Sequence, residues 1–110
     1  MIIYSIPNNQ LAMSYEASKV LSQANAVAIL VAMYEARSEI NVTALWHEVG
    51  SGYSAIKNSA LRLHDYGLVS LRTQDRTMFV DLTPVGRAVA KHLSDACFDL
   101  QNLLDAGSKQ

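Results

Sequence analysis

A chain of 110 residues, half of them hydrophobic, is long enough for one domain with a single buried core. The formal net charge of −1 at pH 7 excludes a protein that coats nucleic acid through bulk positive charge. Cys97 is the only cysteine, so an intramolecular disulfide is excluded and a reducing cytoplasm is expected. The amino terminus lacks the basic segment of a signal peptide, and the longest apolar run, residues 26–34, is far shorter than the ~20 residues that span a bilayer. We therefore expect a soluble protein with no membrane partner.

Charge is unevenly distributed along the chain. Residues 1–49 carry two basic side chains against four acidic ones, whereas residues 50–82 carry four basic against three acidic. The remaining residues are balanced. Positive charge is thus mildly concentrated in the middle of the chain.

The first third of the chain predicts an arm and two helices. Residues 2–6 suit a short strand or an extended arm, and the Pro-Asn-Asn sequence after them supplies a turn and an N-cap for a helix over 10–21. Ser22 or Asn25 can cap the next helix, residues 26–37, which is apolar on nearly all sides. We expect this second helix to be buried on most faces at the centre of the domain.

The middle of the chain predicts a pair of helices joined by a sharp turn. Residues 39–42 suit a short strand, and Thr43 is a suitable N-cap for a helix that ends at Gly50. Gly-Ser-Gly at 50–52 permits the positive φ angles of a tight turn. A longer helix over 53–66 follows, and Gly67 suits the position after its end. Its inner face is predicted from the i, i+4, i+7 spacing of Ile56, Ala60 and Leu63.

A β-hairpin is predicted next. Residues 68–72 and 78–82 alternate between apolar and polar side chains, and the polar stretch 73–77 suits an exposed connection between the two strands. Thr83 is a suitable N-cap for a final helix, and Pro84 suits its first turn, where the missing N–H costs nothing.

The final helix, about residues 84–105, carries an apolar stripe that is longer than one small domain needs to cover. The stripe predicts a coiled-coil type of seam between two copies of the chain, and the alternative is a helix that packs back along its own domain. The predicted dimer-interface residues are Val89, Leu93, Ala96, Leu100 and Leu103.

Two motifs carry a resemblance to a known group of proteins. Leu63 is followed after three residues by Gly67-Leu68-Val69, and Leu82 begins the run Leu-Thr-Pro-Val-Gly-Arg over residues 82–87. With these motifs, residues 38–93 resemble the winged helix-turn-helix of prokaryotic and archaeal transcriptional regulators of the MarR, ArsR and PadR group. The resemblance implies a mainly α fold with a small β-hairpin wing (α+β), an added N-terminal helix and a long C-terminal dimerisation helix.

One domain is expected over residues 1–110. It would comprise an N-terminal arm and helix (1–22), a winged-helix core (23–83) and a dimerisation helix (84–106). The resemblance further implies that the helix 53–66 lies in the major groove of DNA and that the turn 72–77 reaches the backbone or minor groove.

The outward face of the helix 53–66 can be matched to DNA groups. Lys57 and Arg62 suit phosphates or guanine, Asn58 suits adenine, and Ser54 can donate to either. The predicted DNA-binding residues on the helix and the wing are Ser54, Lys57, Asn58, Arg62, Arg72, Gln74 and Arg76. Leu61 and Asp65 on the same face fit DNA less well, and they leave open a second hypothesis in which this face binds another protein.

We therefore predict a cytoplasmic, homodimeric transcriptional regulator. Its two recognition helices would lie in successive major grooves of one duplex, about 34 Å apart, at a spacing that the dimer helix sets. Enzymatic activity is not expected, because the sequence has no glycine-rich phosphate loop, no nucleophile elbow and no carboxylate pair in an apolar setting.

Three other hypotheses concern ligands. His92, Asp95 and Asp99 share a helix face, but zinc needs three or four converging ligands, so a solvated polar face is favoured and no metal or cofactor is expected. Cys97 is interpreted as a small buried hydrophobe rather than a redox switch. A cluster of Met33, Tyr34 and Trp46 could line a pocket for a small-molecule effector, although such residues more often belong to a core.

Overall fold

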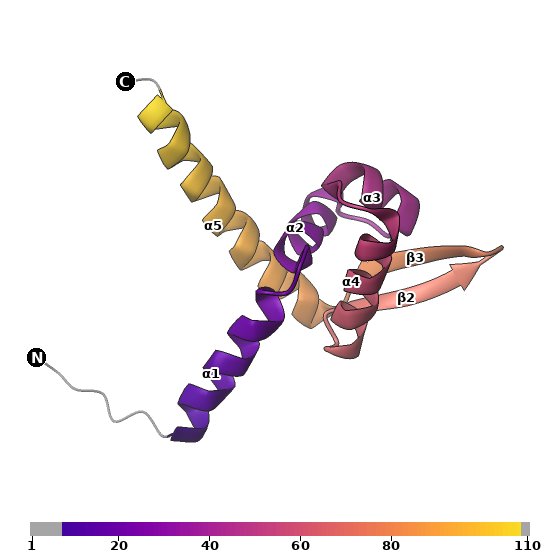
Figure 1. Cartoon of the computed structure of the whole chain (residues 1–110), viewed down its shortest axis with the longest axis horizontal. Coiled ribbons are helices and arrows are strands. Elements are labelled where there is room, and N and C mark those ends of the chain that lie inside the picture. The colour runs from indigo at the N-terminus through magenta and orange to yellow at the C-terminus, as the bar shows by residue number, and fades with distance from the viewer. Residues whose placement is uncertain (1–7, 109–110) are drawn as a thin grey trace, which may run out of the picture.

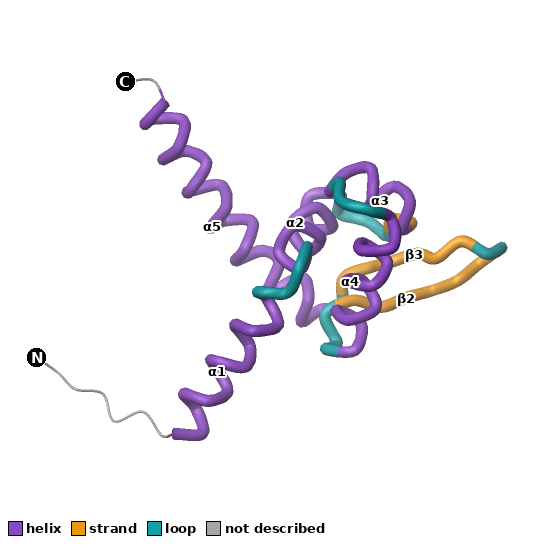
Figure 2. The backbone as a smooth tube through the Cα atoms, viewed as in Figure 1, coloured by secondary structure: helices purple, strands orange, loops and turns teal. Residues whose placement is uncertain are grey.

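A computed structural model describes residues 8–108, which form five helices and three strands (Figure 1). The predicted arm over residues 2–6 lies outside the described residues. The elements follow in the order α1 (Asn8–Leu21), α2 (Ala26–Ala36), β1 (Ile40–Asn41), α3 (Val42–Val49), α4 (Tyr53–Asp65), β2 (Val69–Gln74), β3 (Thr77–Leu82) and α5 (Pro84–Ser108). This is the predicted order, and short loops join α3 to α4 and β2 to β3 (Figure 2).

The three strands form one antiparallel sheet in the order β1-β3-β2. Val69 pairs with Leu82 at the base of the hairpin, and β1 adds Ile40 opposite Val80. Val69 and Val80 are buried, so the predicted alternation of inward and outward side chains is confirmed.

The hairpin turn is shorter than predicted. The strands continue to Gln74 and Thr77, so only Asp75 and Arg76 lie outside them. Both residues have positive φ, 51° and 65°, as in the type I′ turn whose twist matches a β-hairpin. The sequence has no glycine at this turn, which is why the pattern predicted a longer connection.

The core lies between α2, α3, α4 and the sheet. Its fully buried side chains come from each of these elements and include Leu30, Leu45, Ile56, Leu63 and Val80. The prediction that α2 is buried on most faces is wrong for one side. Ile29, Leu30 and Met33 are buried there, but Val27 and Val31 are only partly covered and Ala28 is exposed.

Two predicted helix caps are corrected. Asn41 rather than Thr43 caps α3, because the Asn41 side chain accepts a 2.7 Å hydrogen bond from the Ala44 N–H while Thr43 is exposed within the helix. Asn25 occupies the N-cap position of α2 in a left-handed conformation without a capping bond, and its Oδ1 instead accepts from the Ser51 hydroxyl at 3.1 Å.

The turn between α3 and α4 also differs in detail from the prediction. Positive φ angles occur at Gly50 (87°) and Ser51 (64°), whereas Gly52 has φ −85° and precedes the first residue of α4. The hydrogen bond from the Ser51 hydroxyl to Asn25 joins this turn to the start of α2.

The two sequence motifs meet in one junction between α4, the sheet and α5. The Thr83 hydroxyl donates to the Gly67 carbonyl at 2.7 Å and accepts from the Gly86 N–H at 3.0 Å, which confirms Thr83 as the N-cap. Gly67 has φ 80°, as predicted for the residue after α4. A Cβ on Gly86 would lie 1.8 Å from the Leu68 carbonyl oxygen, so only glycine lets α5 approach the chain here.

The two terminal helices project from this core (Figure 1). The first part of α5 packs on the domain through Val89, Ala90 and Leu93, whereas its distal part and α1 extend away from it. Among the described residues, no single helix is both long and apolar enough to cross a membrane. Residues 15–21 and α2 meet the criteria only together, and they are bent by 73° at their junction.

Candidate nucleic-acid interface

The helix α4 has one face in the core and one face in solvent. Ile56, Ala60 and Leu63 are buried, as predicted, and Ser59 between them donates a 2.8 Å hydrogen bond to the Ala24 carbonyl. This bond fastens α4 to the segment before α2. The helix is thereby held as a rigid element with its opposite face fully available.

The exposed face of α4 carries four of the predicted DNA-binding residues. They are exposed, and within residues 8–108 none of their side chains makes a hydrogen bond or an ion pair. These residues are Ser54, Lys57, Asn58 and Arg62. Leu61 lies on the same face with 36% of its surface exposed, and Asp65 is also exposed. The surface is polar and weakly basic, with one apolar side chain in its middle.

An aromatic cluster fixes the turn in front of α4. The Trp46 indole N–H donates to the Ser51 carbonyl at 2.9 Å. The Trp46 ring stacks on His47 with ring centres 4.6 Å apart, and it meets Tyr53 in a T-shaped arrangement with ring centres 5.8 Å apart. Trp46 is therefore a partly buried support of the helix-turn-helix turn. Met33, which was predicted to line a pocket with Trp46, is buried in the core.

Arg72 in the wing is engaged by other side chains of the protein. Its Nε and Nη2 donate to the two carboxylate oxygens of Glu39 at 3.1 and 2.6 Å, and its Nη1 donates to Gln74 Oε1. The guanidinium also lies 4.4 Å from the centre of the Phe79 ring. This bidentate bond lowers the pKa of Glu39 and raises that of Arg72, because it favours the charged form of each group. Arg72 therefore joins β2 to the segment before β1.

Arg76 differs from Arg72. It lies in the hairpin turn, is exposed, and makes no ion pair or hydrogen bond in the part of the chain that the structure describes. The predicted wing residues thus differ in their contacts. Within the described chain, Arg76 at the tip has no side-chain partner, whereas Arg72 and Gln74 are hydrogen-bonded to each other below it.

Sequence reasoning missed two residues that position this surface. Ser59 gives no signal, because a serine on the edge of an apolar stripe is equally suited to solvent. Glu39 contacts Arg72 across 33 residues, and the two meet because β1 and β2 both pair with β3. No local pattern contains that information.

The structure also bears on the residues of the metal and cysteine hypotheses. Within residues 8–108, no group of three or more His, Cys, Asp or Glu side chains lies close enough to hold a metal ion, and Asp95 pairs with Lys91 at 3.2 Å. Cys97 is exposed, so its interpretation as a buried hydrophobe is wrong for the single chain.

Comparisons with known proteins bear on the fold. A scan against protein-family models finds no match, and a search of curated proteins likewise finds none. Among solved structures, the AntR antimony-specific transcriptional repressor is 18% identical, and the match covers 98% of this chain and 91% of AntR with a TM-score of 0.69. The transcriptional regulator HlyU from Vibrio vulnificus is 21% identical over 80% of this chain and 91% of HlyU, with a TM-score of 0.66.

A third solved structure is also similar to this chain. Sso10a-2, a DNA-binding protein from Sulfolobus solfataricus, is 17% identical over 76% of this chain and 88% of its own, with a TM-score of 0.60. The chain has a winged-helix fold. The predicted fold class is confirmed, with α3 and α4 as the helix-turn-helix pair and β2-β3 as the wing of this winged helix. The roles stated for these three proteins are transcriptional or DNA-binding rather than enzymatic.

Proposed function

We propose that this winged helix binds specific sites on double-stranded DNA as a dimeric transcriptional regulator in the cytoplasm. The observation that carries the proposal is the exposed face of α4, where basic and amide side chains have no partner among the described residues. A single helix of this kind fits the major groove. The stated roles of AntR, HlyU and Sso10a-2 support it.

Each residue of the surface has a proposed role. Lys57 and Arg62 neutralise phosphates or bind guanine, while Asn58 pairs with adenine and Ser54 donates to a phosphate or base. Arg76 at the tip of the wing reaches the backbone or the minor groove. Arg72 and Gln74 lie below it, and because three of the five N–H groups of Arg72 are already bound, we assign this pair chiefly to holding the wing in place.

Dimerisation is proposed through the distal half of α5. Of the predicted interface residues, Val89 and Leu93 pack on their own domain, whereas Ala96, Leu100 and Leu103 are exposed. Phe98 and Leu104 add further exposed apolar surface. The seam is therefore proposed to begin near Ala96, beyond the part of α5 that covers the core, and to space the two copies of α4 by about 34 Å, one turn of DNA.

A second candidate function rests on Leu61. An exposed leucine at the centre of the α4 face, next to Asp65, is also what a protein-binding surface presents. This alternative predicts binding that is insensitive to the charges of Lys57 and Arg76.

A salt titration separates the two functions. Fluorescence anisotropy with duplexes enriched from a genomic library should show affinity that falls steeply with salt, and Lys57→Ala or Arg76→Ala should each reduce the slope of log K against log salt by about one. Lys91→Ala is the matched control, because Lys91 pairs with Asp95 on α5, and its slope should equal that of the wild type. Absence of duplex binding, or equal slopes for all variants, contradicts the proposal.

A further inference from the structure

A groove of about 550 Å³ lies between α2, the end of α3 and α5. Its volume is within the range of small-molecule sites. Most of its wall is apolar and comes from the incompletely covered side of α2, together with one side chain each from α3 and α5. These residues are Val27, Ala28, Val31, Ala32, Val49 and Cys97.

Two carboxylates complete the lining of this groove. Glu35 comes from the end of α2 and Glu48 from the end of α3. Both are exposed, and in the described part of the chain neither forms an ion pair or hydrogen bond. Among the residues that the structure describes, no basic side chain lines the groove. An apolar wall with two unpaired negative charges is complementary to a molecule that is both apolar and positively charged.

We propose that this groove binds a lipophilic organic cation, such as an aromatic amine or a quaternary onium ion. The cation would lie between Glu35 and Glu48, and its apolar groups would cover the wall of α2. A second copy of the chain fits the groove less well, because burial of two unpaired carboxylates in a subunit seam is costly. In addition, the exposed apolar residues Phe98, Leu100 and Leu103 do not line the groove.

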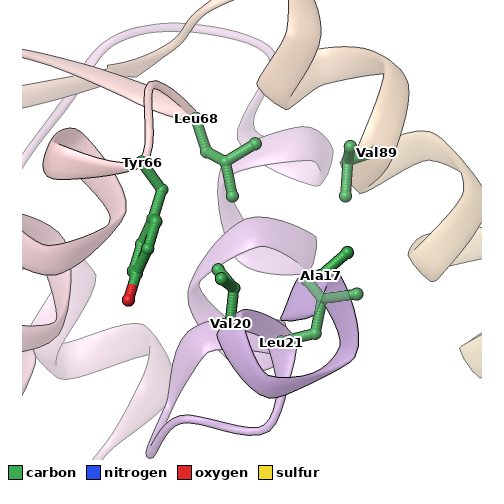
Figure 3. A pocket seen from close by; sticks show the side chains of 6 residues that line it. All are labelled: Ala17, Val20, Leu21, Tyr66, Leu68 and Val89. Atoms are coloured by element: carbon green, nitrogen blue, oxygen red, sulfur yellow. The ribbon is translucent and has the colours of Figure 1, made fainter. Parts of the chain in front are cut away.

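A second groove on the molecule serves as an internal control. It lies between the end of α1, the Tyr66-Leu68 segment and α5, has a volume of about 230 Å³, and is lined by Ala17, Val20, Leu21, Tyr66, Leu68 and Val89 (Figure 3). None of the residues described as lining it is charged, and the Tyr66 hydroxyl accepts a 3.1 Å hydrogen bond from Gln23. It therefore offers apolar surface without a preference for either sign of charge.

The charged groove has a regulatory consequence that rests on the proposed function. It joins α3, the first helix of the helix-turn-helix pair, to α5, which carries the proposed seam. A bound cation would contact both elements at once and so bias their relative position. This site differs from the effector pocket predicted around Met33, Tyr34 and Trp46, none of which lines it.

Isothermal titration of the full chain with tetraphenylphosphonium, in the absence of DNA, tests the proposal. Its anionic counterpart, tetraphenylborate, has nearly the same shape and controls for apolar binding. We expect one tetraphenylphosphonium per chain and at least about tenfold weaker binding of tetraphenylborate, because the two carboxylates attract one ion and repel the other. Equal binding of both ions, or binding of neither, overturns the proposal.

Variants locate the site. Glu35→Gln and Glu48→Gln should each weaken tetraphenylphosphonium binding by about fivefold to tenfold. Ala28→Leu, at an exposed position in the wall, should weaken binding by occupying part of the groove while leaving the thermal unfolding temperature within a few degrees of the wild type. Glu16→Gln on α1 and Ala17→Leu in the second groove are controls and should not change the affinity. Loss of binding in Ala17→Leu but not in Ala28→Leu contradicts the assignment.

The design keeps the two proposals distinguishable. Cation binding is measured without DNA, so a chain that binds the cation but no duplex retains this site and loses only the proposed function. Binding that occurs in Leu103→Ser but not in the wild type would show that a second copy occupies the groove, and would overturn the inference.

Discussion

The helix α4 and the distal half of α5 are both amphipathic, but their apolar side chains lie in opposite environments. In α4 the apolar side chains Ile56 and Leu63 are buried, and the polar side chains other than Ser59 are in solvent. In distal α5 the apolar side chains are in solvent, with exposed fractions of 55% for Leu100 and 69% for Leu103. Packing within one chain thus accounts for the sequence of α4, whereas the exposed apolar residues of distal α5 are those that the proposed seam would cover.

The same contrast divides α5 itself. Ala90 is fully buried and Gly86 lies against the Leu68 backbone, so the first turns of α5 belong to the domain. The distal turns contact nothing comparable in the described chain and include Phe98, which is 67% exposed. Stability should therefore respond to changes in the first part of the helix, and assembly to changes in the second.

The largest expected effect comes from a matched pair of leucines on α4. Leu63→Ala should lower the free energy of unfolding by about 2–5 kcal/mol, because Leu63 is 2% exposed and its removal leaves a cavity. Leu61→Ala, two residues away and 36% exposed, should cost less than about 1 kcal/mol. Urea unfolding followed by circular dichroism measures both. Equal losses of unfolding free energy in the two variants would contradict the assignment of Leu63 to the buried face and Leu61 to the exposed face.

The next effect tests distal α5. Leu103→Ser should raise the dimer dissociation constant by about 100-fold, since the change is made in both copies of a symmetric seam. Analytical ultracentrifugation measures this shift. Val85→Ser, also on α5 but near its start, is a control, because Val85 is 63% exposed and lies far along the helix from the seam. A wild-type chain that is monomeric at all concentrations, or a dimer unaffected by Leu103→Ser, would contradict the proposed seam.

A third effect tests the first turns of α5. Gly86→Ala should destabilise the protein by about 1–3 kcal/mol or more, because the added Cβ would lie 1.8 Å from the Leu68 carbonyl oxygen. Gly107→Ala in the distal helix meets nothing within 4 Å and should be neutral or stabilising by up to about 1 kcal/mol. Thermal unfolding compares the two, and a harmless Gly86→Ala would show that α5 does not approach the domain at this point.

The smallest expected effect concerns the ion pair between Arg72 and Glu39. The hydrogen bond from Arg72 lowers the pKa of Glu39 in the folded state, so this pair stabilises the fold above the unfolded pKa of glutamate. The contribution is lost as pH falls through the lowered folded pKa. Glu39→Gln should therefore be slightly less stable than the wild type at pH 7, and the difference should disappear at the acid end of a pH series of urea midpoints. A constant difference at all pH values would exclude the ion pair as its cause.

Much of the fold could be predicted because its determinants are local. The inner face of α4, the αL glycine after it and the Thr83 cap are each visible within a few residues, and the structure confirms them. Errors occurred where two neighbouring residues compete, as Asn41 and Thr43 do for the cap of α3.

The surface was harder to predict because it depends on distant contacts. Arg72 and Arg76 look equivalent in the sequence, yet Glu39, 33 residues from Arg72, engages one and leaves the other free. In the same way, the apolar stripe of α5 runs without a break through Leu93 and Leu100. Leu93 packs on the core and Leu100 is exposed because the rest of the domain ends between them.

The proposed function requires two copies of α4 to bind one duplex. Selection of bound sites from a random duplex pool, followed by hydroxyl-radical footprinting of the enriched sequence, tests it most directly. We predict a near-palindromic site with two protected half-sites about 10–10.5 base pairs apart, centre to centre. Failure to enrich any sequence, or protection of one isolated half-site by the wild-type chain, would contradict it.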